Sequence, residues 1–213
     1  MDLFGPDRQP TLLEFEEMAA RRGYRCVAGI DEAGRGPLAG PVVAAAVILR
    51  PGTTIAGVMD SKKLSEARRE ALFEPIMTGA LAVGIGIADH LLIDQINILQ
   101  ATLYAMSQAV GNLAILPDFL LIDGISTIPL PLPQKTIKKG DSASLSIAAA
   151  SIIAKVTRDR LMVEYGGHYP GYGFAGHKGY GCAEHLAAIG RLGPCAIHRK
   201  TFRGVREHVK EEG

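Results

Sequence analysis

A chain of 213 residues with 47% hydrophobic content can bury the core of one sizeable α/β domain or two small ones, and we expect one domain over 1–213. The formal net charge is only +1, which excludes neither a polyanionic partner nor a neutral one. Its distribution is uneven: residues 1–134 carry 10 Lys and Arg against 15 Asp and Glu, whereas 135–213 carry 13 against 7. This asymmetry is compatible with an acidic site beside a basic surface.

The cysteines and the N-terminal segment indicate in which cellular compartment the protein is expected. Cys26, Cys182 and Cys195 are odd in number and lack the spacing of metal ligands, which argues against a disulfide framework or a zinc site. No basic region followed by an apolar one opens the chain, and no run approaches the roughly 18 apolar residues of a membrane span. We therefore expect a cytoplasmic protein that makes no membrane contact.

Strand-like and helical patterns alternate along the chain. Apolar runs rich in β-branched residues predict buried strands at 26–30, 42–49, 81–88 and 119–122, with 134–140 as a candidate for one more. Helical patterns cover 12–23, 65–77, 91–110, 142–165 and 182–190. Strands in mixed order with interleaved helices, followed by a helical part from about residue 143 onward, predict a three-layer α/β fold.

Acidic residues follow two of the predicted strands. Asp31 and Glu32 come just before the turn sequence AGRG, and Asp123 closes the run at 119–122. Neighbours on a strand point to opposite faces, so Asp31 and Glu32 converge only if the strand ends there. The glycines that follow permit such a turn, although a solvated turn is the commoner outcome for these residue types. Parallel, adjacent strands would bring Asp123 to the same ligand-binding edge, and a plain turn at Asp123-Gly124 is the alternative.

A further acid, Asp141, follows Gly140 at the start of the long helical pattern. A helix N-cap and a site role are equally compatible with that position, and the two are not exclusive. We assign Asp159, beside Arg158 and Arg160, to a solvated charged face. Clustered carboxylates repel one another unless positive charge holds them ionised. Oxygen ligands without His or Cys nearby favour Mg²⁺ or Mn²⁺, and a pair of such ions supports phosphoryl chemistry.

The sequence resembles type 2 ribonuclease H, the bacterial ribonuclease HII family. Five motifs carry the likeness in order, from about residue 26 to about residue 198: GIDEAGRGPLAGPVVAAAVIL, DSKKLS, LLIDG, KGDSASLSIAAASIIAKVTRD and YGFAGHKGYGCAEH. The resemblance implies a ribonuclease H-like mixed sheet flanked by helices, with a helical C-terminal part. It implies an endonuclease that hydrolyses the RNA strand of RNA–DNA hybrids and nicks duplex DNA 5′ to embedded ribonucleotides. Two-metal-ion catalysis with Mg²⁺ or Mn²⁺ would leave 5′-phosphate and 3′-hydroxyl ends.

The resemblance also assigns roles to individual residues. The catalytic, metal-binding carboxylates fall on Asp31, Glu32, Asp123 and Asp141. Backbone groups of glycine-flanked residues can approach a 2′-hydroxyl closely, and a tyrosine can stack on a neighbouring sugar or base. Tyr172 is a rival for that tyrosine. The substrate-binding residues implied are Gly34, Arg35, Gly36, Ser61, Lys62, Lys63 and Tyr180. The implied partners are an RNA–DNA hybrid and ribonucleotide-containing duplex DNA; we expect a monomer, and recruitment by a sliding clamp stays open.

Several readings stay open at this point. Lys62 and Lys63 fit a solvated pair nearly as well as phosphate contacts, and the basic run 199–206 fits a solvated face or a phosphate site. His177 and His185 lie in a glycine-rich loop that suits backbone contacts, so we leave them out of the catalytic set. A nucleotide-binding ATPase lacks its G-x-x-x-x-G-K-[ST] loop here. A non-catalytic hybrid-binding module or a DNA junction nuclease would share the fold without needing all these motifs.

Overall fold

The computed structural model describes residues 12–55, 57–58 and 64–209. Its five strands form one sheet in the order β3-β2-β1-β4-β5. The strands are β1 (Val27–Ala33), β2 (Val42–Ile48), β3 (Ala82–Ala88), β4 (Phe119–Asp123) and β5 (Gln134–Ile137). The helices are α1 (Glu14–Arg21), α2 (Glu66–Gly79), α3 (His90–Gly111), α4 (Leu145–His168), α5 (Phe174–His177) and α6 (Ala183–Leu192), with the 3₁₀ turns η2 (Gly140–Ser142) and η3 (Arg206–His208).

The sheet is mixed, as predicted. β1 pairs antiparallel with β2 and β2 with β3, whereas β1 and β4, and β4 and β5, run parallel. The pairing of β1 is uneven: its ladder with β2 continues to Ala33, but its ladder with β4 stops at Ile30. Beyond Ile30, one side of β1 is therefore no longer covered by a neighbouring strand. The segment 134–140 supplies β5, which confirms the candidate fifth strand.

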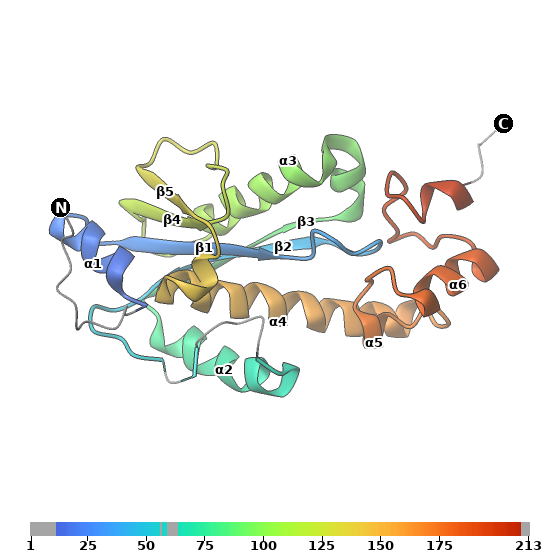
Figure 1. Cartoon of the computed structure of the whole chain (residues 1–213), viewed down its shortest axis with the longest axis horizontal. Coiled ribbons are helices and arrows are strands. Elements are labelled where there is room, and N and C mark those ends of the chain that lie inside the picture. Colours follow the sequence, from blue (N-terminus) through green and yellow to red (C-terminus); the bar gives the residue numbers. More distant parts are fainter. Residues whose placement is uncertain (1–11, 56, 59–63, 210–213) are drawn as a thin grey trace.

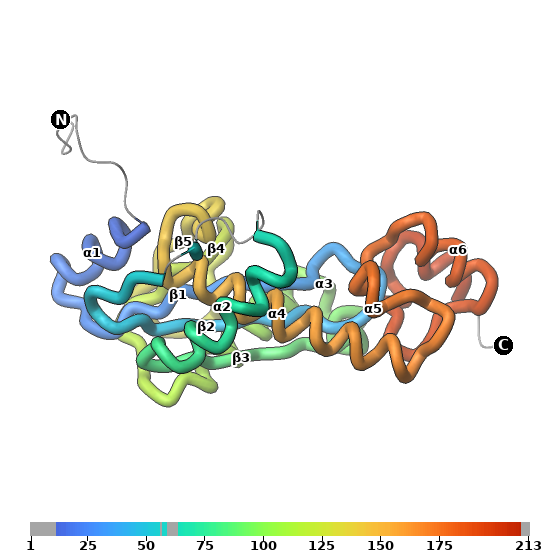
Figure 2. The backbone as a smooth tube through the Cα atoms, turned by 90° about the horizontal axis from the view of Figure 1, so that it is seen from below, coloured from blue at the N-terminus to red at the C-terminus, as the bar shows by residue number. Residues whose placement is uncertain are grey.

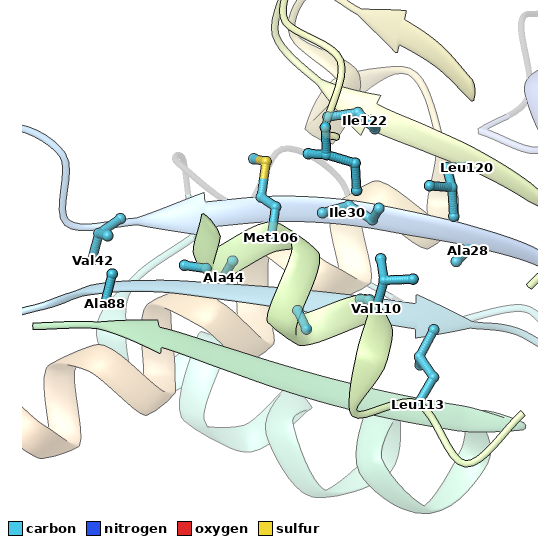
Figure 3. Packing of buried hydrophobic residues seen from close by; sticks show 14 of the residues in the cluster. Ala28, Ile30, Val42, Ala44, Ala88, Met106, Val110, Leu113, Leu120 and Ile122 are labelled. Carbon is cyan, nitrogen blue, oxygen red and sulfur yellow. The ribbon is translucent and has the colours of Figure 1, made fainter. Parts of the chain in front are cut away.

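Helices cover both faces of the sheet, which gives three layers (Figure 1). On one face, Ala28 and Ile30 of β1 pack with α3 residues such as Met106 and Val110, as Figure 3 shows. On the other face, α2 and α4 pack against the alternate residues of β2, including Ala45 and Val47. Alternation of side chains along each strand explains why almost all of β2 is apolar: both of its faces are buried.

Glycines allow the helices to approach the sheet closely. A Cβ atom at Gly29 of β1 would lie 2.2 Å from the backbone carbon of Ser146, at the start of α4. A Cβ at Gly86 of β3 would lie 2.0 Å from the carbonyl oxygen of Ala105 in α3. Neither position tolerates a side chain without displacement of a helix backbone, so these glycines set the spacing between layers.

The C-terminal part after β5 is helical in the described residues, as predicted. α4 runs along the sheet, and α5, α6 and η3 gather at one end of it, beyond the strands (Figure 2). α4 begins at Leu145 with Ser144 as its N-cap, three residues later than the pattern from 142 predicted. α3 bends at Asn97, whose positive φ of 67° breaks the helix, while its Oδ1 accepts hydrogen bonds from the N–H groups of Leu99 and Gln100.

No helix in the described part of the chain is long and apolar enough to cross a membrane. The single domain over 1–213 stays a prediction.

Candidate active site

The parallel pairing of β1 and β4 brings two predicted acids to one edge of the sheet. Asp31 follows the last residue of β1 that pairs with β4, and Asp123 is the final residue of β4. The two carboxylates are close enough for the charge of Asp123 to act on Asp31. Asp123 Oδ1 also accepts a hydrogen bond of 2.6 Å from the N–H of Gly140, which ties η2 to the same edge. Three segments far apart in the sequence therefore meet here.

The prediction that β1 ends before the acids was wrong. Asp31 and Glu32 lie inside β1, because the antiparallel ladder with β2 holds the backbone in strand conformation as far as Ala33. The two acids are nevertheless connected through α4: Ser151 hydrogen-bonds the Asp31 carboxyl, and Ser151 lines the same pocket as Glu32. The end of the β4 ladder, rather than the end of the strand, opens the space that they share.

Asp31 is buried to 3% exposure and its environment disfavours the ionised form. Burial raises the pKa of its carboxyl well above the ordinary value, and the charges of Glu32 and Asp123 raise it further. Hydrogen bonds from Ser151 and from the N–H of Glu32, the latter at 2.7 Å, act in the opposite direction. Positive charge placed next to this carboxyl would oppose the shift and favour the ionised form.

Asp141 lies in η2 and is 1% exposed, next to the residue that binds Asp123. The N-cap of α4 is Ser144, whose Oγ accepts a hydrogen bond from the N–H of Ile147. The capping alternative for Asp141 was therefore wrong, because Asp141 belongs to a separate 3₁₀ turn that ends before the N-cap of α4. That turn instead places Asp141 directly after the residue whose N–H binds Asp123.

All four predicted ligands are carboxylates, and an oxygen-only donor set suits a hard divalent cation. Within the described residues, no three His, Cys, Asp or Glu side chains are grouped tightly enough to be a ready-made metal site. The set still fits a cation, because buried Asp31 forms no ion pair with any described cationic residue and is repelled by two other carboxylates. The role of the four acids as metal ligands stays a prediction.

Beside the acidic edge lies an open pocket of about 460 Å³. The turn after β1 forms one wall, and Tyr180 and α4 form the others. Arg35 Nη1 lies 3.5 Å from Glu32 Oε1, which joins the turn to the acids. Its lining residues are Glu32, Ala33, Gly34, Arg35, Gly36, Arg69, Ser151, Lys155 and Tyr180. An acidic group and three cationic ones thus share one concave surface.

The two tyrosine candidates differ in exposure. Tyr180 is 46% exposed and lines the pocket, with Lys155 Nζ lying 5.9 Å from the centre of its ring. Tyr172 is 8% exposed, stacks on Phe174, and donates its hydroxyl proton to the carbonyl of Gly193 at 2.6 Å. Tyr180 is therefore the better placed of the two to contact a substrate.

The three remaining substrate-binding predictions, Ser61, Lys62 and Lys63, lie outside the described residues. Two pocket residues that the sequence did not single out are Arg69 and Lys155. Lys155 comes four residues before Asp159 on the same helix, and this spacing is the signal that could have paired them.

Asp159 itself corrects a prediction. It is 7% exposed, and its Oδ1 lies 2.6 Å from Lys155 Nζ, so it does not belong to a solvated face. Arg158 and Arg199 are likewise fully buried, although Arg158 adjoins the residue that we assigned to a solvated face, and Arg199 begins the run for which a solvated face or a phosphate site stayed open. Long-range contacts with the turn after β1 bury them, and such contacts leave no mark on local sequence.

His177 and His185 hold the backbone around Tyr180, which supports leaving them out of the catalytic set. His177 Nε2 lies 2.7 Å from the carbonyl of Tyr172, and the N–H of Gly179 donates to His177 Nδ1. His185 Nδ1 donates to the carbonyl of Tyr180 at 2.9 Å, and its Nε2 lies 3.0 Å from His198 Nε2. Burial lowers the pKa of His185, and that of His198 to about 4, so both stay neutral at pH 7.

The fold has close counterparts among solved structures. The ribonuclease H2 of Pyrococcus horikoshii OT3 superimposes with a TM-score of 0.72 at 26% identity, covering 86% of this chain and 96% of that one. This likeness places the chain in the class of type 2 ribonucleases H by its fold.

Sequence comparison narrows the class further. The profile of the family described as Ribonuclease HII matches residues 28–205. The ribonuclease HII of Geotalea uraniireducens is 68% identical over all of this chain and 98% of its own length. That of Geobacter metallireducens is 69% identical, covering 98% of each chain. The chain belongs to the ribonuclease HII family, and it is a ribonuclease H that cleaves the RNA strand of RNA–DNA hybrids.

Proposed function

We propose that the enzyme also nicks duplex DNA on the 5′ side of a single embedded ribonucleotide, by metal-dependent hydrolysis at the acidic edge. The observation that supports this most is the shared position of the acids and the pocket: Glu32 and Ser151 line the pocket, and Ser151 also binds Asp31. A scissile phosphate at the acids would place the adjoining sugar beside residues 34–36. The substrate is then any duplex that presents a 2′-hydroxyl at that point.

Each group has a distinct task in this proposal. Asp31, Glu32, Asp123 and Asp141 hold two ions, Mg²⁺ or Mn²⁺, and when bound these ions supply the positive charge that polarises the phosphodiester and its attacking water. Attack of water on phosphorus breaks the bond to O3′, which leaves 3′-hydroxyl and 5′-phosphate ends. Ser151 orients the Asp31 carboxyl through its hydrogen bond.

The other pocket residues bind and orient the duplex. Arg69 and Lys155 supply positive charge for backbone phosphates, which carries affinity but no sequence information. Tyr180 stacks on the nucleotide next to the ribonucleotide, and the turn at 34–36 contacts the 2′-hydroxyl. Ser61, Lys62 and Lys63 extend the phosphate contacts in the same proposal.

The decisive experiment compares a duplex containing one ribonucleotide with the same duplex in all-DNA form, with Mg²⁺, with Mn²⁺ and with EDTA. We expect one nick at the ribonucleotide, in the presence of metal only, with a 5′-phosphate on the downstream product. Asp123→Asn conserves shape but removes charge, so it should lose the nick. Cleavage of the all-DNA duplex would favour a junction-type nuclease, and tight hybrid binding without any nick would favour a binding module.

A further inference from the structure

Two buried arginines support the turn between β1 and β2. Arg199 Nη2 donates to the carbonyl of Gly34 at 2.5 Å, its Nη1 to that of Arg35 at 3.0 Å, and its Nε to that of Gly40 at 3.0 Å. Arg158 binds the carbonyls of Ala39, Pro41 and Lys178 in the same manner at 2.9–3.1 Å. All three nitrogens of each guanidinium are used.

These arginines have no acidic partner among the described side chains. Burial lowers the pKa of Arg158 to about 10 and that of Arg199 to about 9, so both remain charged at neutral pH. A buried charge without an ion-pair partner is costly, and here backbone carbonyls bind every guanidinium nitrogen, while the more distant charges of Asp159 and Asp94 favour the charged forms of Arg158 and Arg199. Such an arrangement fixes the direction of the carbonyl groups that it binds.

The carbonyl directions determine where the N–H groups of the turn point. Both peptide bonds, Gly34–Arg35 and Arg35–Gly36, are trans, so the N–H of each unit points opposite to its C=O. Because Arg199 is buried and takes both carbonyls, the N–H groups of Arg35 and Gly36 face outward. Residues 35 and 36 are exposed and line the pocket, and neither N–H donates a hydrogen bond to any described residue.

We propose that Arg199 is a positioning residue for substrate discrimination: it aims the N–H groups of Arg35 and Gly36 at an oxygen atom of the ribonucleotide. This rests on the proposed function, and it adds a residue outside the pocket to it. Hydrogen bonds to the carbonyls also polarise the two peptide units and strengthen their N–H donors. The oxygen is either the 2′-hydroxyl or a non-bridging phosphate oxygen, since both accept hydrogen bonds.

The test replaces Arg199 with Lys, which keeps the charge but cannot bind three carbonyls in a fixed fork. Cleavage efficiency, kcat/KM, is measured on three duplexes: one with a single ribonucleotide, one with 2′-fluoro in place of its hydroxyl, and one with a methylphosphonate at the adjoining phosphate. For the wild-type protein, the modification that removes the contacted oxygen lowers kcat/KM. In Arg199→Lys, we expect that penalty to be about tenfold smaller, the effect of one hydrogen bond.

The matched control is Arg158→Lys, which loosens the same turn at residues 39 and 41 but leaves the two outward N–H groups supported. Arg158→Lys should show the same reductions in kcat/KM on the 2′-fluoro and methylphosphonate duplexes as the wild-type protein. A reduced penalty in the 2′-fluoro arm alone identifies the hydroxyl, and one in the methylphosphonate arm alone identifies the phosphate. An equal loss by Arg199→Lys on all three duplexes, or the same pattern in Arg158→Lys, would overturn the proposal. A wild-type protein that leaves all ribonucleotide duplexes intact would overturn the proposed function itself.

A second measurement uses the wild-type protein and so does not depend on whether the variant folds. With EDTA present, the amide proton resonances of Arg35 and Gly36 should move downfield on addition of the one-ribonucleotide duplex, and less with the all-DNA duplex. Unchanged resonances at both residues, with binding shown by shifts elsewhere, would also overturn the proposal.

Discussion

The acidic edge and the support of the 34–41 turn are both built from buried charge, but they treat it in opposite ways. At the edge, Asp31 is surrounded by other acids, and its pKa is raised because burial and repulsion disfavour its charge. Beneath the turn, Arg158 and Arg199 carry charge that backbone carbonyls satisfy on every nitrogen. A bound cation would stabilise the ionised form of Asp31 at the edge. Beneath the turn, the chain itself supplies a hydrogen-bond acceptor for every guanidinium nitrogen. The difference matches the roles that we propose for them: metal binding for the acids and support of the turn for the arginines.

The largest effect should come from Asp31→Asn. Losing several kcal/mol of metal-supplied stabilisation lowers kcat by about a thousandfold or more. Because the folded-state pKa of Asp31 lies above its unfolded value, its ionisation near pH 7 costs stability, so the neutral variant should melt at the same or a higher temperature in EDTA. Asp118→Asn, at the opposite end of β4, should keep activity. A marked fall in melting temperature for Asp31→Asn would show that the acidic edge is structural.

Arg158→Ala should behave in the opposite way to Asp31→Asn: it should mainly lower the stability of the fold. Removing the guanidinium leaves three buried carbonyls without donors, at about 3 kcal/mol or more in total. Urea unfolding measures the loss. Arg160→Ala, two positions further along α4, removes an exposed pair with Glu70 and should change stability by no more than about 1 kcal/mol. Equal losses for the two variants would contradict the contrast between buried and surface charge.

Tyr180→Ala should weaken cleavage at a lone ribonucleotide by about tenfold, since loss of one stacking contact is worth about 1–3 kcal/mol. Tyr180→Phe keeps the ring and should retain most activity. The measurement is the ratio of single-ribonucleotide to all-RNA hybrid cleavage. Tyr172→Phe removes only a hydroxyl contact with Gly193 and should cost about 1 kcal/mol of stability without altering that ratio. If this cleavage ratio changed in Tyr172→Phe but not in Tyr180→Ala, the role of the stacking tyrosine would pass from Tyr180 to Tyr172.

The smallest effect concerns pH. The folded-state pKa of His198, about 4, lies below the ordinary value of 6.5, so the unfolded chain takes up the proton first as pH falls. Stability from this site is complete above about pH 6.5 and is lost progressively toward pH 4. His198→Gln should flatten the pH dependence of the melting temperature across that window, which thermal melts of the variant and the wild type at several pH values measure. If the melting temperatures of His198→Gln and of the wild type changed with pH in parallel, the conclusion that His185 and His198 form a neutral pair would be refuted.

The sequence predicted the layers and the acids better than it predicted the buried cations. Strand composition and the acid that follows 119–122 are local signals in the sequence. The parallel pairing of β1 with β4 fits the mixed sheet that the family resemblance implied. The extent of β1 and the 3₁₀ turn before α4 depend on β2 and on Asp123, which no local pattern encodes. Arg158 and Arg199 look like surface residues in their own segments, and contacts over more than a hundred positions, with the Lys178 carbonyl added for Arg158, bury them.

The bond between Arg199 and Gly34 joins residues 165 positions apart. During synthesis at about 5–20 residues per second, the turn therefore exists for about ten to thirty seconds before its support is made. β1, β2 and the acidic edge have all their residues well before that time. If the turn selects the cleavage position as we propose, a nascent chain therefore carries its acids before it can form the support of that turn.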